Sequence, residues 1–550
     1  MLEQQARNAL TREAFVWDIP QHYNIGVDIC DRHAAARPDA IAIIDVAEDG
    51  TTRQCSFETL RQSSNQLANA LAKLSAKGDR IGVLLPQSIE TAQSHIAITK
   101  SARIALPLFT LFGPDALLHR LRDSGSNVVI TNAEGAAKLA AIRAELPDLK
   151  HVICVEPAPA SALNFAQLCA AESADFAFKP TLAEDPAILI YTSGTTGNPK
   201  GALHAHRVLL GHLPGVEMSH DFFPQPGDRI WTPADWAWIG GLLDVMMPAL
   251  HHGVTVVACR FRKFSAQAAF DLMRAQKIRN AFLPPTALKM MRLWPEAEAQ
   301  RLEMRSVASG GETLGKELIA WGQRVFGCTI NEFYGQTECN MIVSSCAALE
   351  PAEPGVMGFA VPGHTLAILD EETGTQVERG AEGSIAVRAP DPVMFLRYWN
   401  NPEATAAKFL SVGDKRWLVT GDKGRVTPSG RIAFIGRDDD VISSSGYRIG
   451  PAEIEDCLLT HPAVHLAGVV GKPDPVRGSI VAAYIQLSQG VDPSPALADE
   501  IALHVKDKLA AYEFPRVVRF IETMPATTTG KIIRAQLRLM AQEEADNEQQ

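Results

Sequence analysis

Apolar and polar positions alternate along the first part of the chain in a way that is typical of mixed helix and strand structure. Leu60, Leu67, Leu71 and Leu74 share one face of a predicted helix that Gly78 can terminate. Residues 81–85 then read as a buried strand. Helix-like stretches at 89–99 and around 117–121 and a strand at 128–130 follow. This alternation predicts parallel sheets with helices on their faces.

The same rhythm continues beyond the middle of the chain and then changes. Strands are predicted at 187–191, 254–257 and 281–283, with a helix near Phe270 and Met273. From about residue 355, short strands such as 366–369 and 384–387 are separated by turn-rich segments, which is typical of a small barrel or antiparallel sheet.

The last part of the chain predicts a separate α+β domain. After the polar stretch from Arg437 to Asp440, the pattern gives a helix at 452–459, strands at 466–470 and 481–487, a helix at 499–509 and a strand at 517–521. We therefore expect an α/β protein with a large N-terminal domain at 1–437, built from parallel α/β subdomains and a β-barrel at about 355–435. A smaller α+β domain at 438–550 follows, and we expect its polar end from Gln542 to Gln550 to fray.

Composition excludes several classes of protein. The chain has 550 residues, of which 46% are hydrophobic and 21% charged, so it is neither disordered, fibrous nor a small disulfide scaffold. A net charge of −11 without long basic runs makes nucleic-acid binding unexpected. Nine cysteines without a C-x-x-C pair indicate reduced thiols, hence a cytoplasmic protein. No uncharged apolar run approaches the ~18 residues of a membrane span, and a homo-oligomer is compatible with the sequence.

Residues 191–201, Tyr-Thr-Ser-Gly-Thr-Thr-Gly-Asn-Pro-Lys-Gly, predict a phosphate-binding loop directly after a buried strand. Glycines let backbone N–H groups approach phosphate oxygens, hydroxyls donate to them, and Lys200 offsets their charge. The spacing lacks the G-K-[ST] ending of P-loop NTPases. A flexible surface turn is the alternative. The candidate phosphate ligands are Thr192, Ser193, Gly194, Thr195, Thr196, Gly197 and Lys200.

Five further segments follow in a fixed order along the chain: SGGET at 309–313, YGQTE at 334–338, TGDKGR at 420–425, GYRIGPAEIE at 446–455 and PATTTGKIIR at 525–534. Together with the loop they resemble the adenylate-forming superfamily of acyl-CoA synthetases, amino-acid adenylation domains and beetle luciferases. The resemblance covers nearly the whole chain, and its medium-chain acyl-CoA synthetase branch is the most similar.

The resemblance implies a nucleotide site in the N-terminal domain. Tyr334 stacks on adenine, Thr337 touches the α-phosphate, and Glu338 binds Mg²⁺ together with the Thr192 hydroxyl, as suits a hard cation that bridges phosphates. A solvated carboxylate is the alternative for Glu338. The remaining adenine-side positions are Gly311, Glu312, Thr313, Gly335 and Gln336.

The resemblance also assigns residues around and beyond the domain boundary. Asp422 accepts both ribose hydroxyls, since a carboxylate can take one hydrogen bond on each oxygen; a turn aspartate is the alternative. Arg437 contacts ribose or phosphate, and Asp439 is the hinge. Gly446 lets a pantetheine arm pass the backbone, and Arg448 faces a phosphate in one domain orientation. A β-hairpin with Ser-Gly at its tip is compatible with both interpretations of the 442–449 segment.

Lys531 is the implied catalytic residue. On a mobile C-terminal domain, its ammonium would bridge the attacking carboxylate and the α-phosphate and stabilise charge in the transition state. Taken alone, a lysine on the surface usually serves solubility.

The acyl pocket is implied by the segment 232–241, TPADWAWIGG, and by residues after the metal-binding glutamate. Family members specific for acetate or propionate carry Trp where Gly335 stands, so the smallest acids should not be preferred here. The candidate acyl-binding residues are Trp236, Trp238, Gly240, Gly335, Cys339 and Met341. The two tryptophans could equally be core residues.

These assignments imply a two-step ligase that uses ATP, Mg²⁺ and coenzyme A. A medium-chain fatty or aryl acid becomes acyl-AMP with release of pyrophosphate, and the acyl group then passes to the coenzyme A thiol. Little chain follows Lys531, so we expect free coenzyme A as acceptor. A carrier protein supplied in trans, a non-catalytic adenylate-binding sensor and a luciferase-type oxygenase are the alternatives.

Overall fold

The computed structural model describes residues 15–157, 161–178, 180–192, 199–302, 304–311, 314–353, 355–370, 372–437, 440–444, 447–474, 478–509, 513–527 and 531–548. The chain forms two compact units. The first comprises Met1–Glu353, Met357–Thr365 and Arg388–Phe409, and the second comprises Pro354–Val356, Leu366–Val387 and Leu410–Gln550. The boundary between the N-terminal and C-terminal domains, which the sequence places near residue 437, stays a prediction.

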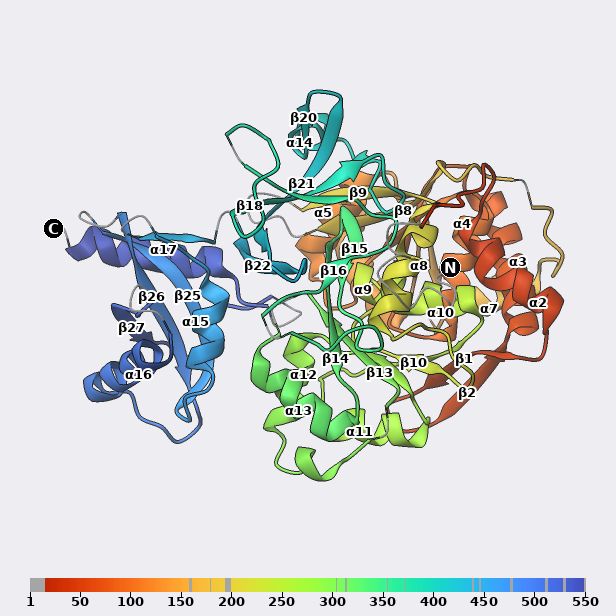
Figure 1. The fold of residues 1–550 in the computed structure, drawn as a ribbon. Coiled ribbons are helices and arrows are strands. Elements are labelled where there is room, and N and C mark those ends of the chain that lie inside the picture. Colours follow the sequence, from red (N-terminus) through yellow and green to blue (C-terminus); the bar gives the residue numbers. More distant parts are fainter. Residues whose placement is uncertain are drawn as a thin grey trace. The chain divides into compact units, whose positions relative to one another are not determined.

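The first sheet of unit 1 joins strands from the whole length of that unit (Figure 1). Its strands, in spatial order, are β16 (Phe359–Ala360), β15 (Cys339–Ser344), β14 (Ile330–Gln336), β13 (Ser306–Gly310), β12 (Asn280–Phe282), β10 (Arg229–Trp231), β11 (Thr255–Cys259), β1 (Ile41–Val46) and β2 (Thr52–Ser56). The strands from β14 to β1 run parallel, while β2, β15 and β16 pair antiparallel.

The second sheet of unit 1 carries the predicted phosphate loop. Its order is β19 (Arg397–Tyr398), β9 (Lys200–Ala205), β8 (Pro186–Thr192), β4 (Ile104–Pro107), β3 (Arg80–Leu84), β5 (Val128–Thr131), β6 (His151–Cys154) and β7 (Leu163–Asn164). β3, β4, β5, β6 and β8 run parallel, which confirms the predicted α/β class.

Helices connect these strands, and most follow from the apolar periodicity. They are η1 (Val27–Asp31), α2 (Arg32–Ala36), α3 (Phe57–Leu74), α4 (Ile89–Lys100), α5 (Pro114–Ser124), α6 (Ala133–Ile142), η2 (Arg143–Glu145), α7 (Phe165–Ala170), α8 (Val208–Ser219), α9 (Ile239–Gly241), η3 (Leu242–Met246), α10 (Met247–His252), α11 (Ala266–Ala275), α12 (Pro285–Leu293), η4 (Ala297–Ala299), α13 (Lys316–Phe326) and α14 (Pro402–Ala407). α3 begins after Ser56, whose hydroxyl accepts the Thr59 N–H at 3.2 Å, and buries Leu60, Leu67 and Leu71. It ends at Leu74, before Gly78.

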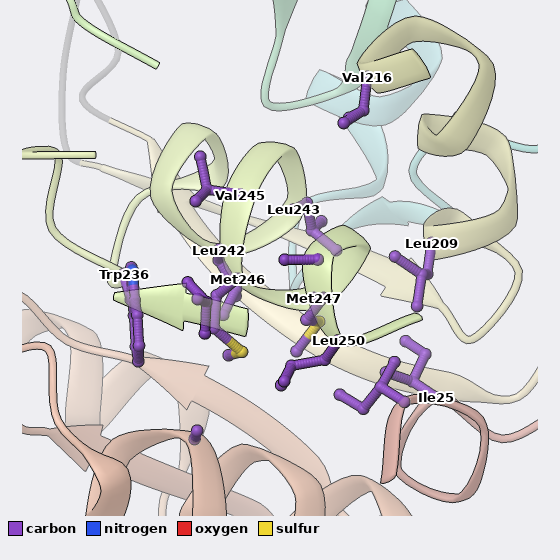
Figure 2. Packing of buried hydrophobic residues seen from close by; sticks show 14 of the residues in the cluster. Ile25, Leu209, Val216, Trp236, Leu242, Leu243, Val245, Met246, Met247 and Leu250 are labelled. Carbon is purple, nitrogen blue, oxygen red and sulfur yellow. The ribbon is translucent and has the colours of Figure 1, made fainter. Parts of the chain in front are cut away.

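A large apolar core of unit 1 lies around α8, η3 and α10. α8 is buried on every side, and most of its residues are apolar. Figure 2 shows the side chains of η3 and α10 lying between Trp236 on one side and Leu209 and Ile25 on the other. This core fixes the segment that contains the predicted acyl-binding residues.

Unit 2 contains two further sheets. The first, β17 (Leu366–Leu369), β18 (Glu382–Ala389), β21 (Lys415–Val426) and β20 (Phe409–Val412), with β22 (Ile432–Arg437) paired to β21, corresponds to the predicted small barrel. The second contains β24 (Tyr447–Ile449), β23 (Ile442–Ser444), β26 (Gly478–Leu487) and β25 (Val464–Asp474), with β27 (Val517–Phe520) paired to β26. Its helices are α15 (Pro451–Leu458), α16 (Pro495–Lys508) and α17 (Arg534–Glu548), which confirm the α+β prediction for the end of the chain.

The prediction of a fraying tail from Gln542 is wrong up to Glu548. These residues continue α17, which packs on β25 and β26 through the fully buried Leu537 and Ala541. The polar composition of the last turns hid this, because the buried positions lie earlier in the helix. Across the described part of the chain, no helix combines the length and the apolarity that crossing a bilayer requires.

Candidate active site

The predicted phosphate loop joins two paired strands of the second sheet. Thr192 ends β8, Lys200 begins β9, and the two residues face each other in the antiparallel ladder. The Thr192 hydroxyl donates to the Lys200 carbonyl oxygen over 3.5 Å. Ser193, Gly194, Thr195, Thr196 and Gly197 lie outside the described residues. The hairpin therefore fixes both ends of the loop.

Glu338 lies with Thr337 in the turn that joins β14 to β15. Its side chain is buried, with 7% of the residue exposed, which argues against the solvated carboxylate that was the alternative. Glu338 Oε1 accepts a hydrogen bond from the Tyr398 hydroxyl, and the Glu338 carbonyl oxygen accepts the Phe395 N–H at 2.9 Å. Within the described residues, the second carboxylate oxygen has no hydrogen-bond donor. A positioned carboxylate with one unused oxygen suits a metal ligand.

Tyr398 links Glu338 to the lysine of the phosphate loop. It lies on β19, pairs with Ala202 of β9, and places its ring 5.5 Å from Lys200 Nζ. Burial and the nearby Glu338 carboxylate raise the pKa of Tyr398, so its hydroxyl keeps the proton that it donates. Sequence reasoning did not single out Tyr398, because a two-residue strand leaves no periodic signal; the aromatic pair Tyr398-Trp399 was the available hint.

The adenine-side residues gather at the carboxyl ends of β13 and β14. Gly310 pairs with Phe333 in the parallel ladder, so Gly311 and Tyr334 follow at the same edge. Gly311 has φ +97° and open space where a Cβ would stand, a conformation that suits glycine. Gln336 accepts a hydrogen bond from Lys408 Nζ at 2.9 Å. Glu312 and Thr313 lie outside the described residues.

The two tryptophans of the acyl segment have different surroundings. Trp236 is completely buried in the apolar core, which favours the core alternative for this residue. Trp238 is partly exposed, and its ring centroid lies 5.5 Å from that of Phe109 and 6.0 Å from that of Phe112. The three rings form an apolar group with tilted and edge-on contacts. We call Trp238, Phe109 and Phe112 the aromatic group.

The other acyl candidates are closely packed. A Cβ on Gly335 would lie 2.2 Å from Asn340 Oδ1, so the position beside Gly335 is filled by Asn340 rather than open. A Cβ on Gly240 would lie 2.8 Å from Phe282. Cys339 is fully buried on β15, and Met341 packs against Gly215 of α8 in the core.

In unit 2, the small barrel sheet brings two predicted ribose contacts together. Asp422 of β21 pairs directly with Arg437 of β22. The Asp422 N–H donates to the Thr420 hydroxyl at 3.1 Å, which holds the turn before the aspartate. The two residues are distant in the sequence, but the antiparallel register of β21 and β22 places them side by side.

The C-terminal residues lie on defined segments of the same unit. Lys531 is exposed, and its loop is closed by a 2.7 Å hydrogen bond from the Thr527 N–H to the Lys531 carbonyl oxygen. Arg448 is on β24, opposite Ser443, so the hairpin interpretation of 442–449 is confirmed. Asp439 and Gly446 lie outside the described residues. Arg534, at the start of α17, donates two hydrogen bonds to the buried Glu455 of α15, a contact that the motif alone did not reveal.

The donor set fits a magnesium ion that arrives with phosphates. Mg²⁺ takes oxygen ligands and keeps several waters, so one carboxylate and one hydroxyl suffice beside a nucleotide. Glu338 and Thr192 supply these groups. Over the residues that the structure covers, no three His, Cys, Asp or Glu side chains gather into a metal-binding group, as expected where the protein supplies few of the ligands.

The chain belongs to the family of AMP-binding enzymes. The family's sequence profile, "AMP-binding enzyme", matches residues 30–399, and the profile "AMP-binding enzyme C-terminal domain" matches residues 453–531.

Individual relatives cover nearly the whole chain. It is 33% identical to "Acetyl-coenzyme A synthetase" of Bacillus subtilis (94% of this chain, 90% of that one). It is 32% identical to "Acyl-coenzyme A synthetase ACSM4, mitochondrial" of Rattus norvegicus (94% and 91%). A solved structure of the anthranilate CoA ligase AuaEII with anthranoyl-AMP is similar with a TM-score of 0.86 and 29% identity, covering 96% of this chain and 99% of that one. The protein is accordingly an AMP-forming acid–CoA ligase that uses ATP, Mg²⁺ and coenzyme A.

Proposed function

We propose that this enzyme activates an aryl or medium-chain monocarboxylic acid. It forms acyl-AMP and pyrophosphate from the acid and ATP, and then transfers the acyl group to coenzyme A. The observation that carries the nucleotide half of the proposal is the linked set of Thr192, Lys200, Tyr398 and Glu338 at the ends of two sheets in unit 1.

The first half-reaction needs the phosphates and the acid to be held in line. Thr192 and Glu338 would hold the metal ion, which supplies positive charge that stabilises the phosphate oxygens as pyrophosphate leaves. Lys200 adds a second positive charge beside the loop. Tyr334 would pack against adenine, while Thr337 donates to the α-phosphate.

Two groups of unit 2 have the chemistry that adenylation also requires. Asp422 accepts the two ribose hydroxyls, and the Arg437 guanidinium opposite it in the ladder supplies positive charge for ribose or phosphate oxygens. The Lys531 ammonium contacts the attacking carboxylate and the α-phosphate, where negative charge develops in the transition state.

The second half-reaction exchanges oxygen for sulfur on the acyl carbon. The coenzyme A thiolate attacks the acyl carbonyl, the thioester bond forms, and AMP leaves with the electron pair of the broken C–O bond. A turn of the C-terminal domain at Asp439 would withdraw Lys531 and bring Gly446 beside the pantetheine arm. Arg448 would then meet a phosphate.

The acyl segment supports an aromatic or medium-length acid. The aromatic group offers an apolar surface, and no indole occupies position 335. One similar solved structure is that of an anthranilate CoA ligase, and one relative is named for acetate. Substrate choice is therefore the part of the proposal that most needs measurement.

The test is a product analysis of the full-length enzyme. The protein is incubated with ATP, Mg²⁺, coenzyme A and a mixture of acetate, butyrate, octanoate and benzoate, and products are identified by mass spectrometry. We expect benzoyl-CoA or octanoyl-CoA to dominate, with AMP and pyrophosphate. Dominant acetyl-CoA would contradict the acid proposed, and AMP formation that is independent of coenzyme A would favour a different acceptor.

We also propose a cytoplasmic location. All nine cysteines of the chain are unpaired, and eight of them are buried. Unpaired thiols persist in reducing compartments, which is also where ATP and coenzyme A are available to the enzyme. Fractionation of the native cells with an antibody against the protein tests this, and recovery of the protein outside the cytoplasmic fraction would contradict it.

A further inference from the structure

Asp244 is a charged residue type inside an apolar run. Between Ile239 and Leu250 it is the sole Asp, Glu, Lys or Arg of the sequence. It lies on η3 between Leu243 and Val245, both labelled in Figure 2, and only 3% of the residue is exposed. Burial of a carboxyl group costs free energy unless hydrogen bonds compensate. A carboxyl group at this place therefore requires polar partners.

Two buried polar side chains lie next to it. Asn340 Nδ2 donates to Asp244 Oδ1 at 2.7 Å. His212 Nε2 lies 3.9 Å from the same oxygen, which is too far for a hydrogen bond. Both neighbours are at most 4% exposed. We call Asp244, Asn340 and His212 the Asp244 cluster.

The cluster leaves hydrogen-bonding capacity unused. Within the described residues, His212 Nε2 has no hydrogen-bond partner, and no hydrogen bond reaches Asp244 Oδ2. A buried polar atom without a partner gains free energy when it forms a hydrogen bond, so these two atoms can bind a polar group of a ligand.

The chemical state of each group follows from its contacts. His212 Nδ1 lies 2.7 Å from the Val208 carbonyl oxygen, which only accepts, so Nδ1 carries the proton and Nε2 is an acceptor. Burial lowers the pKa of His212 to about 4 and holds the pKa of Asp244 well above its ordinary value. The cluster thus presents a neutral imidazole beside a carboxyl group whose protonated form is favoured by burial. A hydroxyl or amino group, which can both donate and accept, matches this pair.

The cluster borders the acyl segment. A Cβ on Gly240 would lie 3.6 Å from Asp244 Oδ2, and a Cβ on Gly335 would lie 2.2 Å from Asn340 Oδ1. Both glycines belong to the predicted acyl-binding residues. The segment that carries Trp238 of the aromatic group continues directly into η3, which carries Asp244. The predicted acyl-binding region therefore combines the aromatic group with the polar side chains of the Asp244 cluster.

Neither a metal site nor a structural ion pair accounts for the cluster. A metal site is excluded within the described residues, since no three His, Cys, Asp or Glu ligands gather there. A structural ion pair does not account for the cluster, because the imidazole and the carboxyl group are 3.9 Å apart and burial disfavours the charged form of both.

We propose that the Asp244 cluster is the subsite that selects the acid, by binding a neutral hydroxyl or amino substituent of an aromatic monocarboxylate. The substituent donates to His212 Nε2 and meets the Asp244 carboxyl group, while the ring packs on the aromatic group. The inference rests on the proposed acyl-CoA synthetase activity and names the acid class for it.

The test compares acids that differ in one small group. kcat/KM is measured by pyrophosphate release for benzoate and for the three hydroxybenzoates, three aminobenzoates and three toluates. A methyl group matches hydroxyl or amino in size but cannot hydrogen bond. For at least one ring position we expect the hydroxy or amino acid to exceed the matching toluate at least about tenfold, because an analogue without the group leaves buried polar atoms unpaired. The hydroxy and amino arms identify which substituent is used.

Variants connect the preference to the cluster. Asp244→Leu should bring the ratio of polar acid to toluate to one or below, and Asp244→Asn should retain part of the preference. His95→Leu is the matched control, because His95 is a buried histidine of α4 with an unpaired Nδ1 that lies outside the predicted site. Its ratio should equal that of the wild type.

The outcomes separate the inference from the activity on which it rests. Toluates or benzoate used as well as every polar acid by the wild type would overturn the inference while the ligase activity stands, and this comparison decides even where a variant does not fold. An unchanged ratio in a folded Asp244→Leu variant would overturn it too. No pyrophosphate with any carboxylic acid would instead contradict the proposed function.

Discussion

Tyr398 contacts two residues of the predicted nucleotide site. Its hydroxyl donates to Glu338, and its ring lies beside Lys200, so it can orient the predicted metal ligand and the predicted phosphate ligand. Groups that hydrogen bond to a metal ligand fix its orientation and affect metal affinity as strongly as many ligands do.

Tyr398→Phe should therefore raise the Mg²⁺ concentration needed for half-maximal adenylation at least about tenfold, since partners of metal ligands contribute on that scale. The measurement is a Mg²⁺ titration of acid-dependent ATP–pyrophosphate exchange. Tyr23→Phe is the matched control, because Tyr23 donates to a different carboxylate, Asp28, at 2.7 Å. Equal Mg²⁺ requirements in both variants would show that Tyr398 has no role at the metal site.

The sequence predicts some single residues of the candidate site and misses others. Local motifs predict the roles of Glu338 and Lys200, because the neighbouring residues carry the pattern. Tyr398 and Asn340 were not predicted, because their importance comes from contacts across sheets. The sequence does carry a signal for Asp244, namely one carboxyl group in an apolar run.

At the scale of elements, periodicity predicted the strands and helices whose faces differ. β3, β5, β8, α3 and α4 appear where the pattern placed them, within a few residues. α8, η3 and α10 left no such period, since most of their residues are apolar and buried, whichever side of the helix they face. The pairing of β19 with β9 could not be predicted, because register depends on the folded sheet rather than on local sequence.

The contact between α15 and α17 lies just after Lys531, the predicted catalytic residue. Arg534 begins α17 three positions after Lys531 and binds Glu455 of α15 through two nitrogens, at 3.1 and 2.5 Å. Glu455 also accepts the Val469 N–H at 2.8 Å. The loop of Lys531 is thus tied to the core of its own unit.

Arg534→Met should lower the free energy of unfolding of unit 2 by about 3 kcal/mol, because it removes the guanidinium that donates to a buried carboxylate. Chemical denaturation followed by circular dichroism measures the loss. Adding Glu455→Gln should restore most of the stability, since a neutral amide can still accept the Val469 N–H. A double variant as unstable as the single one would contradict the charge argument.

At the scale of the whole molecule, unit 1 buries several neutral histidines. Burial lowers the pKa from 6.5 to about 4 for His95, His206 and His212, and to about 3 for His204 and His220. Between pH 6.5 and 4 the unfolded chain therefore binds more protons than the folded one. Stability is full above pH 6.5 and falls as the pH drops through this window.

We expect the melting temperature of the protein to fall steeply from pH 6.5 to pH 4, since each such histidine contributes up to about 3 kcal/mol of linkage. His95→Leu should make the slope of stability against pH shallower in that window and leave the slope above pH 7 unchanged. Thermal denaturation at a series of pH values measures both. A flat profile between pH 6.5 and 4 would contradict the burial of neutral histidines.

The central claim is that a lysine on the C-terminal unit completes acyl-AMP formation at a nucleotide site on unit 1. The most direct test compares the two half-reactions in Lys531→Ala, with ATP–pyrophosphate exchange for the first and thioester formation from supplied acyl-AMP for the second. We predict a loss of at least about a hundredfold in the first, as expected for a group that stabilises transition-state charge, and little change in the second. Equal losses in both half-reactions would contradict the account.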